Sequence, residues 1–214
     1  MSKLYLASQS PRRAEILTDL GVQFEILQPD PNEDTEALEE EQIGELGIDY
    51  VKRVTLAKLD AAVRRLSQRV EFSWQPILCA DTTVCMRDQQ TSWLNIRDLI
   101  LGKPRDEHHA LEMLTLLNGK FHWVHTAIVL QKDPQSDPIV KICSTQVHFA
   151  NNSPERLAAY VKTKEPMGKA GGYGIQGLGS ALIDRIEGSY SGVMGLPIHE
   201  TTQLLDYAKI PFIL

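Results

Sequence analysis

The stretch "ILCADTTVCM" at residues 77–86 decides the fold, because it is apolar for longer than the half-buried pattern of an edge strand allows. It predicts a buried central strand. Asp81 interrupts this run, although both strand propensity and burial disfavour a carboxylate there. Two interpretations are open: Asp81 caps a turn at the end of the strand, or it faces a cleft as a general base or metal ligand.

The segments around this strand predict a mixture of strands and helices. Hairpin-like strand pairs next to capped amphipathic helices indicate an α/β sheet with helices packed on it. The expected helices are 10–20, 46–69, 106–118, one in "SPERLAAYVKT" and one after Pro197, and the expected strands lie in "LYLAS", "VQFEILQ", "WLNIRDLILGKP", "FHWVHTAIVLQ", "IVKICSTQVHFA" and "ALIDRIEGSY", with a hairpin loop at "RDQQTS".

Composition and charge restrict the function. The net charge of −6 and the pI near 5.5 argue against a broad nucleic-acid interface, although a small anionic ligand in a local basic pocket is allowed. The odd count of 3 cysteines, without CxxC spacing, fits a reducing compartment. No run approaches the length of a membrane span, and the apolar part of "MSKLYLA" is too short for a signal peptide. We therefore expect a cytoplasmic protein without a membrane or nucleic-acid partner.

The motif "SPRR" indicates an anion site. Ser10 and Pro11 are typical of an N-cap and first helical position, so Arg12 and Arg13 fall in the first turn. The positive end of the helix dipole disfavours cations there unless an anion joins them.

Other candidate cations are weaker signals when taken alone. Lys103 lies between glycine and proline in "LGKPRD", but most loop lysines are simply solvated. Lys58 has apolar helix neighbours and could snorkel over the edge of the core.

The "GYGIQG" stretch at 172–177 matches GxGxxG formally, but a strand-like segment follows it, which excludes a dinucleotide fold. It belongs to a glycine loop, residues 167–180. Lys169 in this loop could approach a phosphate, and Gln176 could contact a base edge.

Together, "LASQSPRR", "ADTTV", "LGKPRD" and "KAGGYGIQGLGSALIDRIEGSYSGVMGLP" resemble the Maf family of nucleoside triphosphate pyrophosphatases in order and spacing. The resemblance runs from about residue 4 to the C-terminus and implies one Maf-like domain over residues 1–214. It implies an elongated fold like that of the inosine triphosphate pyrophosphatases, with a long mixed sheet, flanking helices and a central cleft between two lobes.

The resemblance also implies an activity and an active site. The expected reaction cleaves a nucleoside triphosphate between its α and β phosphates with a Mg²⁺ or Mn²⁺ ion, and the expected assembly is a homodimer. Asp81 matches the proposed general base, and Asp81 with Glu33 is expected near the metal. Lys58 and Lys103 are expected to be catalytic together with Asp81. The residues expected to bind the substrate are Ser8, Arg12, Arg13, Thr82, Lys169 and Gln176.

Three of these positions point to the substrate. Arg12, Thr82 and Gln176 match the branch of the family that prefers dTTP and UTP, whereas the 7-methyl-GTP branch typically carries tryptophan, glutamine and glutamate there. We therefore expect a pyrimidine substrate, including modified pyrimidine nucleotides. The alternatives are a 7-methyl-GTP pyrophosphatase and a non-catalytic nucleotide-binding regulator of cell division. Two departures are Gly168, where the family usually has an acid, and a longer segment at 34–49.

Overall fold

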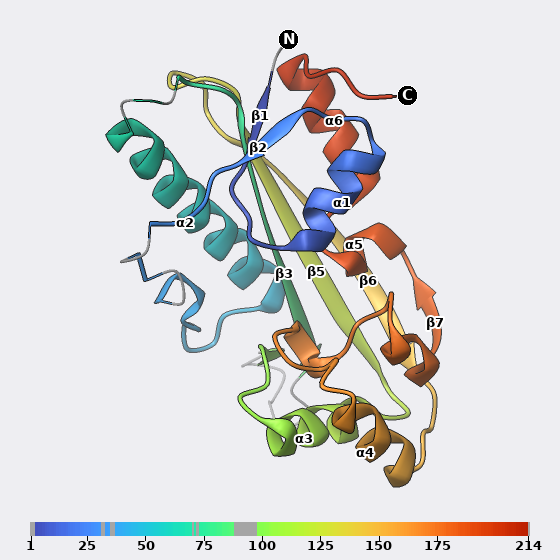
Figure 1. Cartoon of the computed structure of the whole chain (residues 1–214). Helices are drawn as coiled ribbons and strands as arrows, with labels where there is room; N and C mark the ends of the chain where they lie inside the picture. Colours follow the sequence, from blue (N-terminus) through green and yellow to red (C-terminus); the bar gives the residue numbers. More distant parts are fainter. Residues whose placement is uncertain are drawn as a thin grey trace.

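The computed structural model describes residues 3–30, 33–34, 37–69, 71, 73–87 and 98–213. These residues form a mixed sheet of seven strands in the order β2-β1-β3-β5-β6-β7, with β4 beside β3 (Figure 1). β1 is parallel to β2 and β3, and the remaining pairs are antiparallel. The strands are β1 (Leu4–Leu6), β2 (Phe24–Ile26), β3 (Ile77–Arg87), β4 (Asp98–Leu101), β5 (Phe121–Gln131), β6 (Ile139–Phe149) and β7 (Ile183–Glu187).

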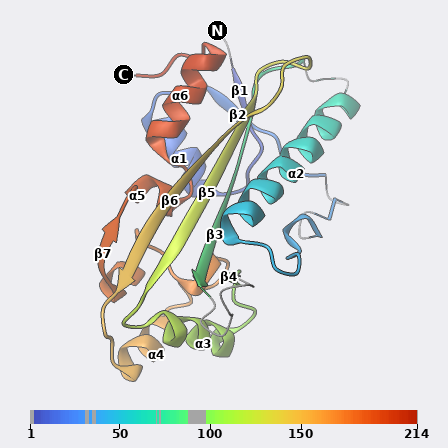
Figure 2. The same cartoon turned by 180° about the vertical axis from the view of Figure 1, so that it is seen from behind.

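Helices cover both faces of this sheet. A long helix crosses one face, and the other helices lie on the opposite side and toward the far end of the long strands (Figures 1 and 2). The α-helices are α1 (Pro11–Asp19), α2 (Gly47–Gln68), α3 (Glu107–Leu117), α4 (Pro154–Lys162), α5 (Tyr190–Met194) and α6 (Ile198–Ala208), and the 3-10 turns are η1 (Ala37–Glu39), η2 (Ala170–Gly172) and η3 (Leu178–Leu182). None of the helices in the described ranges is long and apolar enough to cross a membrane.

Alternation along β3 separates its two faces. Cys79 and Cys85 pack toward α2, in two separate apolar clusters. On the opposite face, Ala80 joins a cluster with α1 and α6, whereas Val84 joins a cluster with α3 and α4. Burial of an aliphatic side chain in such a cluster contributes about 1.5–3 kcal/mol. The apolar packing on both faces is therefore interrupted around residues 81–83.

The edge of β3 is interrupted at the same place. β5 pairs with β3 from Ile77 to Cys85 on one side. On the other side β1 pairs with β3 up to Leu78 and β4 pairs with it from Val84 onward. Within the described residues, no strand pairs with the intervening part of this edge. The sheet thus holds Asp81 rigidly while leaving its surroundings open to a ligand.

The sequence predictions for the fold are largely confirmed. The α/β class, the central position of β3, the mixed sheet and the flanking helices are all observed. The helix expected at 46–69 spans Gly47–Gln68, and the one expected at 10–20 spans Pro11–Asp19. The short elements η1, η2, η3 and α5 were not expected. Residues 88–92 of the expected "RDQQTS" loop lie outside the described residues.

Candidate active site

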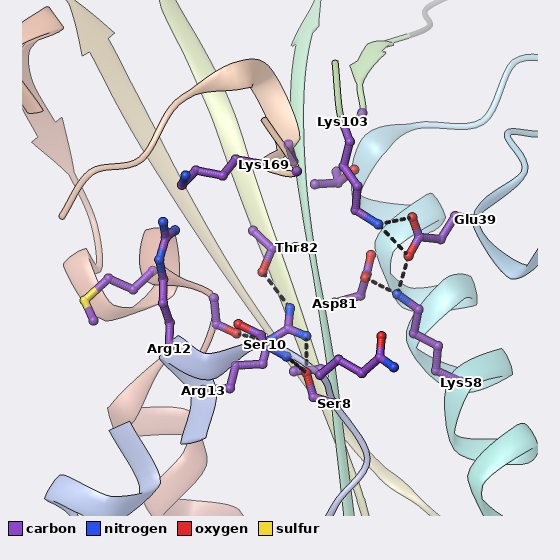
Figure 3. Close-up of a pocket in the computed structure, with 18 of the residues that line it drawn as sticks. Ser8, Ser10, Arg12, Arg13, Glu39, Lys58, Asp81, Thr82, Lys103 and Lys169 are labelled. Carbon is purple, nitrogen blue, oxygen red and sulfur yellow. Dashed lines mark hydrogen bonds and ion pairs between the residues drawn. The ribbon is translucent and has the colours of Figure 1, made fainter. Parts of the chain in front are cut away.

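Asp81 lies in a pocket of about 580 Å³ at the interruption of β3. Its lining contains most of the residues expected around the substrate, and these come from several different elements of the chain (Figure 3). Those brought together here are Ser8, Arg12, Arg13, Lys58, Asp81, Thr82, Lys103 and Lys169. The tertiary structure therefore assembles one pocket from segments that are far apart in the sequence.

Asp81 forms an ion pair with Lys58 of α2. Lys58 Nζ donates to Asp81 Oδ1 over 2.6 Å, and Asp81 is only 8% exposed. Burial of an unpaired carboxylate is costly, so the ammonium compensates the charge of Asp81. Burial by itself would lower the pKa of Lys58, but Asp81 and Glu39 outweigh it and raise that pKa. Lys58 is therefore a half-buried cation paired with a buried acid, and the interpretation that it merely snorkels over the core edge does not explain this pairing.

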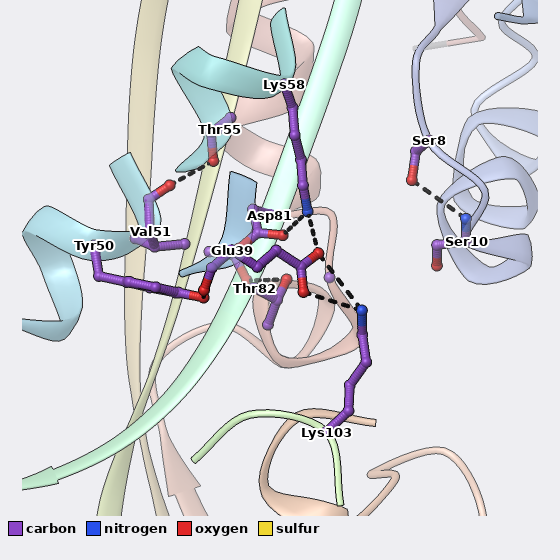
Figure 4. A network of polar contacts seen from close by, with 12 residues as sticks. Ser8, Ser10, Glu39, Tyr50, Val51, Thr55, Lys58, Asp81, Thr82 and Lys103 are labelled. Carbon is purple, nitrogen blue, oxygen red and sulfur yellow. Dashed lines mark hydrogen bonds and ion pairs between the residues drawn. The ribbon is translucent and has the colours of Figure 1, made fainter. Parts of the chain in front are cut away.

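Glu39 connects Lys58 to Lys103. Its Oε1 accepts from Lys58 Nζ at 2.8 Å, and its Oε2 accepts from Lys103 Nζ at 3.1 Å (Figure 4). Burial would raise the pKa of Glu39, but the charges of the two lysines lower it. Tyr50 Oη donates to the backbone carbonyl of Glu39 over 2.8 Å and holds the η1 turn in place. Two ammonium groups and two carboxylates thus alternate on the α2 side of β3.

Arg13 lies on the opposite side of β3. Its Nε donates to the Gly195 carbonyl at 2.8 Å, Nη1 donates to Ser8 Oγ at 2.9 Å, and Nη2 donates to Thr82 Oγ1 at 3.3 Å. Burial lowers the pKa of Arg13, and the charge of Asp81 opposes this change. A guanidinium has five N–H groups, so two remain after these three bonds. Arg13 therefore fixes the pocket wall and still has donors for a ligand.

The hydroxyl of Thr82 is oriented by a chain of hydrogen bonds. Thr126 Oγ1 donates to the Gly192 carbonyl over 2.8 Å, so it accepts from Thr82 Oγ1, which lies 2.9 Å away. Thr82 consequently has an oxygen lone pair for Arg13 and no proton for a ligand. The structure places Thr82 as support for Arg13 in this state of the pocket.

Arg12 and Lys169 form a second group of cations. Within the described part of the chain neither side chain has a carboxylate partner, although Lys169 Nζ donates to the Glu165 carbonyl. Burial lowers the pKa of Lys169, and the charge of Arg12 lowers it further. Figure 3 shows both side chains on the side of β3 away from Lys58 and Lys103. Two cations that repel each other inside a pocket favour a polyanionic ligand.

The first turn of α1 adds donors to this region. Ser10 and Pro11 occupy the N-cap and N1 positions as expected, but in the described structure the Ser10 side chain makes no capping hydrogen bond. The first turn also contains no acidic residue. Backbone N–H groups at a helix N-terminus attract phosphate oxygens, and the adjacent guanidinium groups strengthen this preference.

Glu33, which was expected near the metal with Asp81, is held by Arg65 in this structure. Glu33 lines the pocket, but its carboxylate binds Arg65 of α2 through contacts of 2.6 and 2.9 Å. Arg65 is 5% exposed and also donates to the Leu27 carbonyl. The hydrogen bonds from Arg65 lower the pKa of Glu33. A buried guanidinium requires such a partner, and this need places Glu33 at the wall of the pocket.

Gln176, which was expected to contact a base edge, is not among the residues that line the described pocket. Its neighbours Tyr173 and Ile175 are buried and line the pocket, whereas Gln176 is exposed and does not. The sequence motif identified the loop, but it did not distinguish the residues of the loop that line the pocket from those that do not.

Glu39 is the acid that sequence reasoning missed. It lies in a run of acidic residues at 33–45, where the sequence alone does not distinguish one carboxylate from the next. Its distinction arises from contacts with Lys58 and Lys103, which come from α2 and the segment after β4. A pattern of local spacing does not contain this information.

The chemistry of these donors fits a divalent cation. Mg²⁺ is usually held by one or two carboxylates together with substrate phosphates, and Asp81 and Glu39 share Lys58 as a partner in this pocket. In the described ranges, no group of three or more His, Cys, Asp or Glu side chains is placed to hold a metal. A cation here would thus require ligand oxygens in addition to these two acids.

Comparisons with known proteins agree with the motifs. The family model described as "Maf-like protein" matches residues 3–208. A Burkholderia orbicola protein named dTTP/UTP pyrophosphatase is 48% identical over 210 residues, covering 98% of this chain and 94% of that protein. A Cupriavidus pinatubonensis protein of the same name is 46% identical and covers 98% of both chains.

Among solved structures, the Staphylococcus aureus Ham1 protein matches with a TM-score of 0.42 and 12% identity, over 71% of this chain and 73% of that one. The family model and these two relatives each match nearly the whole chain, in agreement with the sequence motifs. This chain therefore belongs to the Maf family.

Proposed function

We propose that this protein hydrolyses dTTP and UTP to the nucleoside monophosphate and pyrophosphate. Full-length relatives carry that activity in their names, and the pocket has the chemistry to bind a triphosphate. The observation that carries the proposal is the position of Asp81, a buried acid on a rigid strand with cations on both sides of it. Polyphosphate binding needs the cations, and water activation needs the acid.

The proposed reaction is an attack of water on the α phosphorus, in which one P–O bond forms, one P–O bond breaks and one proton is transferred. The oxygen of a water molecule forms a bond to the α phosphorus, and the bond from that phosphorus to the bridging oxygen breaks. Pyrophosphate leaves with the electron pair, and Asp81 accepts the proton of the attacking water. Lys58 places a positive charge 2.6 Å from the Asp81 carboxylate and offsets the charge of that buried acid.

The remaining cations would bind and orient the triphosphate. Arg12, the free donors of Arg13 and the first turn of α1 would hold phosphate oxygens on one side of β3. Lys103 and Lys169 would offset the negative charge that develops on the departing pyrophosphate. Lys103 is suited to this movement because its side chain is 54% exposed and is tethered only by Glu39 within the described residues.

A Mg²⁺ or Mn²⁺ ion forms part of the proposal, with Asp81 and Glu39 as its protein ligands. When bound, the ion would offset phosphate charge and lower the pKa of a coordinated water. Asp81 then acts as a ligand in addition to, or in place of, its role as base. A cytoplasmic location and a homodimer stay predictions from the sequence and the family resemblance.

A substrate panel tests the proposed function. Pyrophosphate release should be measured for dTTP, UTP, CTP and 7-methyl-GTP, with and without added Mg²⁺ or Mn²⁺. The proposal expects the highest kcat/KM with dTTP and UTP. A preference for 7-methyl-GTP would instead support a 7-methyl-GTP pyrophosphatase. Nucleotide binding without hydrolysis would support a non-catalytic nucleotide-binding regulator.

A further inference from the structure

We propose that Glu165 is a positioning residue, which fixes the glycine loop and Lys169 against the substrate pocket. This inference rests on the proposed function, because the pocket is treated as the triphosphate site. Glu165 lies outside the pocket lining and after α4, in a segment between Lys164 and Pro166. Its effect on substrate would therefore pass through the loop and not through direct contact.

The Glu165 carboxylate binds the backbone of the glycine loop at two adjacent positions. Oε2 accepts from the Leu178 N–H at 2.8 Å, and Oε1 accepts from the Gly179 N–H at 3.0 Å. These N–H groups open the η3 turn, where backbone donors need partners. Burial would raise the pKa of Glu165, but these two hydrogen bonds contribute to lowering it. The carboxylate consequently stays charged at neutral pH and holds the far end of the loop.

A second connection runs through Tyr160. Tyr160 Oη donates to Glu165 Oε1 at 2.9 Å and accepts from the Gly174 N–H at 3.1 Å. Gly174 is the point of contact with the pocket cations. A Cβ atom built there would lie 3.1 Å from Lys169 Cε and 3.2 Å from Arg12 Nη2. Glu165 thereby determines where the loop backbone stands against both cations.

The glycines of the loop match this role. A Cβ atom on Gly177 would lie 2.4 Å from Glu165 Oε2, and one on Gly179 would lie 2.7 Å from Tyr160 Oη. Neither position leaves room for a side chain while the carboxylate and the phenol are in place. Gly177 and Gly179 are therefore required for the close approach of Glu165 and Tyr160.

Glu165 also contacts Lys169 through its own backbone. The Glu165 carbonyl accepts a hydrogen bond from Lys169 Nζ. In addition, the charge of the Glu165 carboxylate raises the pKa of Lys169, against the lowering by burial and by Arg12. One residue thus positions the loop backbone, directs the lysine and supports the charge of that lysine.

The variant Glu165→Gln tests the inference. It keeps the shape of the side chain, but in either orientation of the amide its NH₂ group faces a backbone N–H, that of Leu178 or that of Gly179, and one of these hydrogen bonds is lost. Glu155→Gln serves as the control, because Glu155 is an exposed acid on the neighbouring helix α4. Tyr160→Phe removes the hydroxyl that joins Glu165 to Gly174, while it leaves the bonds from Leu178 and Gly179 to Glu165 in place. It gives a second variant should Glu165→Gln fold poorly.

We expect Glu165→Gln to raise the KM for dTTP by about tenfold or more, and to change kcat much less, because the loop carries groups that bind phosphate before the reaction. Tyr160→Phe should change KM in the same direction by a smaller factor. The double variant should show less than the product of the two effects, since both act on one loop.

Hydrogen exchange gives a readout that does not depend on turnover. In Glu165→Gln, the amides of Gly174, Leu178 and Gly179 should exchange faster than in the wild type, while the amides of β5 exchange at the wild-type rate. The control Glu155→Gln should have the melting temperature of the wild type. Unchanged exchange at the three amides, or an unchanged KM, would overturn the inference. If the wild type releases no pyrophosphate from dTTP, the proposed function fails, and the exchange experiment still decides whether Glu165 holds the loop.

Discussion

Lys58 Nζ lies 2.6 Å from Asp81 Oδ1. Lys58 belongs to α2, which packs on one face of the sheet, and Asp81 belongs to the central strand β3. The helix covers apolar residues of β3 on either side of Asp81, so the packing that stabilises the fold also delivers the ammonium. The packing of α2 on β3 therefore both stabilises the core and places the ammonium of Lys58 beside Asp81.

Replacement of the central acid should abolish most turnover. We expect Asp81→Asn to lower kcat for dTTP by ~10²–10⁴-fold, because the amide does not accept the proton of the attacking water. The control is Asp60→Asn, an exposed acid on α2. Pyrophosphate release at saturating dTTP is the measurement, and wild-type turnover by Asp81→Asn would remove Asp81 from the reaction.

The two adjacent arginines should differ in what they affect. Arg12→Ala should raise the KM for dTTP by about tenfold and leave the free energy of unfolding nearly unchanged, since no hydrogen bond is found for Arg12 within the described residues. Arg13→Ala should also destabilise the fold by about 1–3 kcal/mol, because it leaves the Gly195 carbonyl without its donor. Steady-state kinetics and urea unfolding of both variants test this division, and equal loss of stability would contradict it.

The two glutamates near the pocket should separate metal dependence from stability. Glu39→Gln should increase the Mg²⁺ concentration needed for half-maximal activity, because it removes one of the two proposed ligands. Glu33→Gln should leave that concentration unchanged and lower the free energy of unfolding by about 1–3 kcal/mol, because Arg65 loses its charged partner. A metal titration and an unfolding curve for each variant are the measurements. An Mg²⁺ effect confined to Glu33→Gln would restore the assignment made from sequence.

The Glu33 pair also predicts a dependence of stability on pH. Arg65 lowers the pKa of Glu33 in the folded protein below its unfolded value. Its contribution is therefore complete above the unfolded pKa and is lost as pH falls through the folded pKa. The difference in unfolding free energy between wild type and Glu33→Gln should shrink under acidic conditions, and a constant difference would contradict the ion-pair explanation.

Substrate affinity should weaken on the alkaline side because of Lys169. Burial and the charge of Arg12 lower the pKa of this lysine, so it loses its proton at a lower pH than an ordinary lysine with a pKa of 10.5. The KM for dTTP should therefore rise with increasing pH before an ordinary lysine titrates. Lys169→Arg, which stays charged, should flatten this rise. A KM profile that is identical in the two proteins would exclude Lys169 as the titrating group.

Much of the fold could be predicted from local patterns. The apolar run of β3 and the Ser-Pro starts of α1 and α4 depend on interactions within a few residues, which the sequence displays directly. The pocket residues that matched family motifs were also found, because those motifs fix residue type and order. Asp81, Arg13 and Lys103 are examples of residues whose presence in one pocket follows this expectation.

What the sequence by itself determined was the buried strand, the acid within it and the set of cations available to it. Only the tertiary structure decided which acid meets which cation: Glu39 binds Lys58 and Lys103, and Glu33 binds Arg65. The physical reason is that an ion pair depends on a distance of a few ångströms between side chains. That distance is set by the packing of α2 and the glycine loop on the sheet, and not by the number of residues between them.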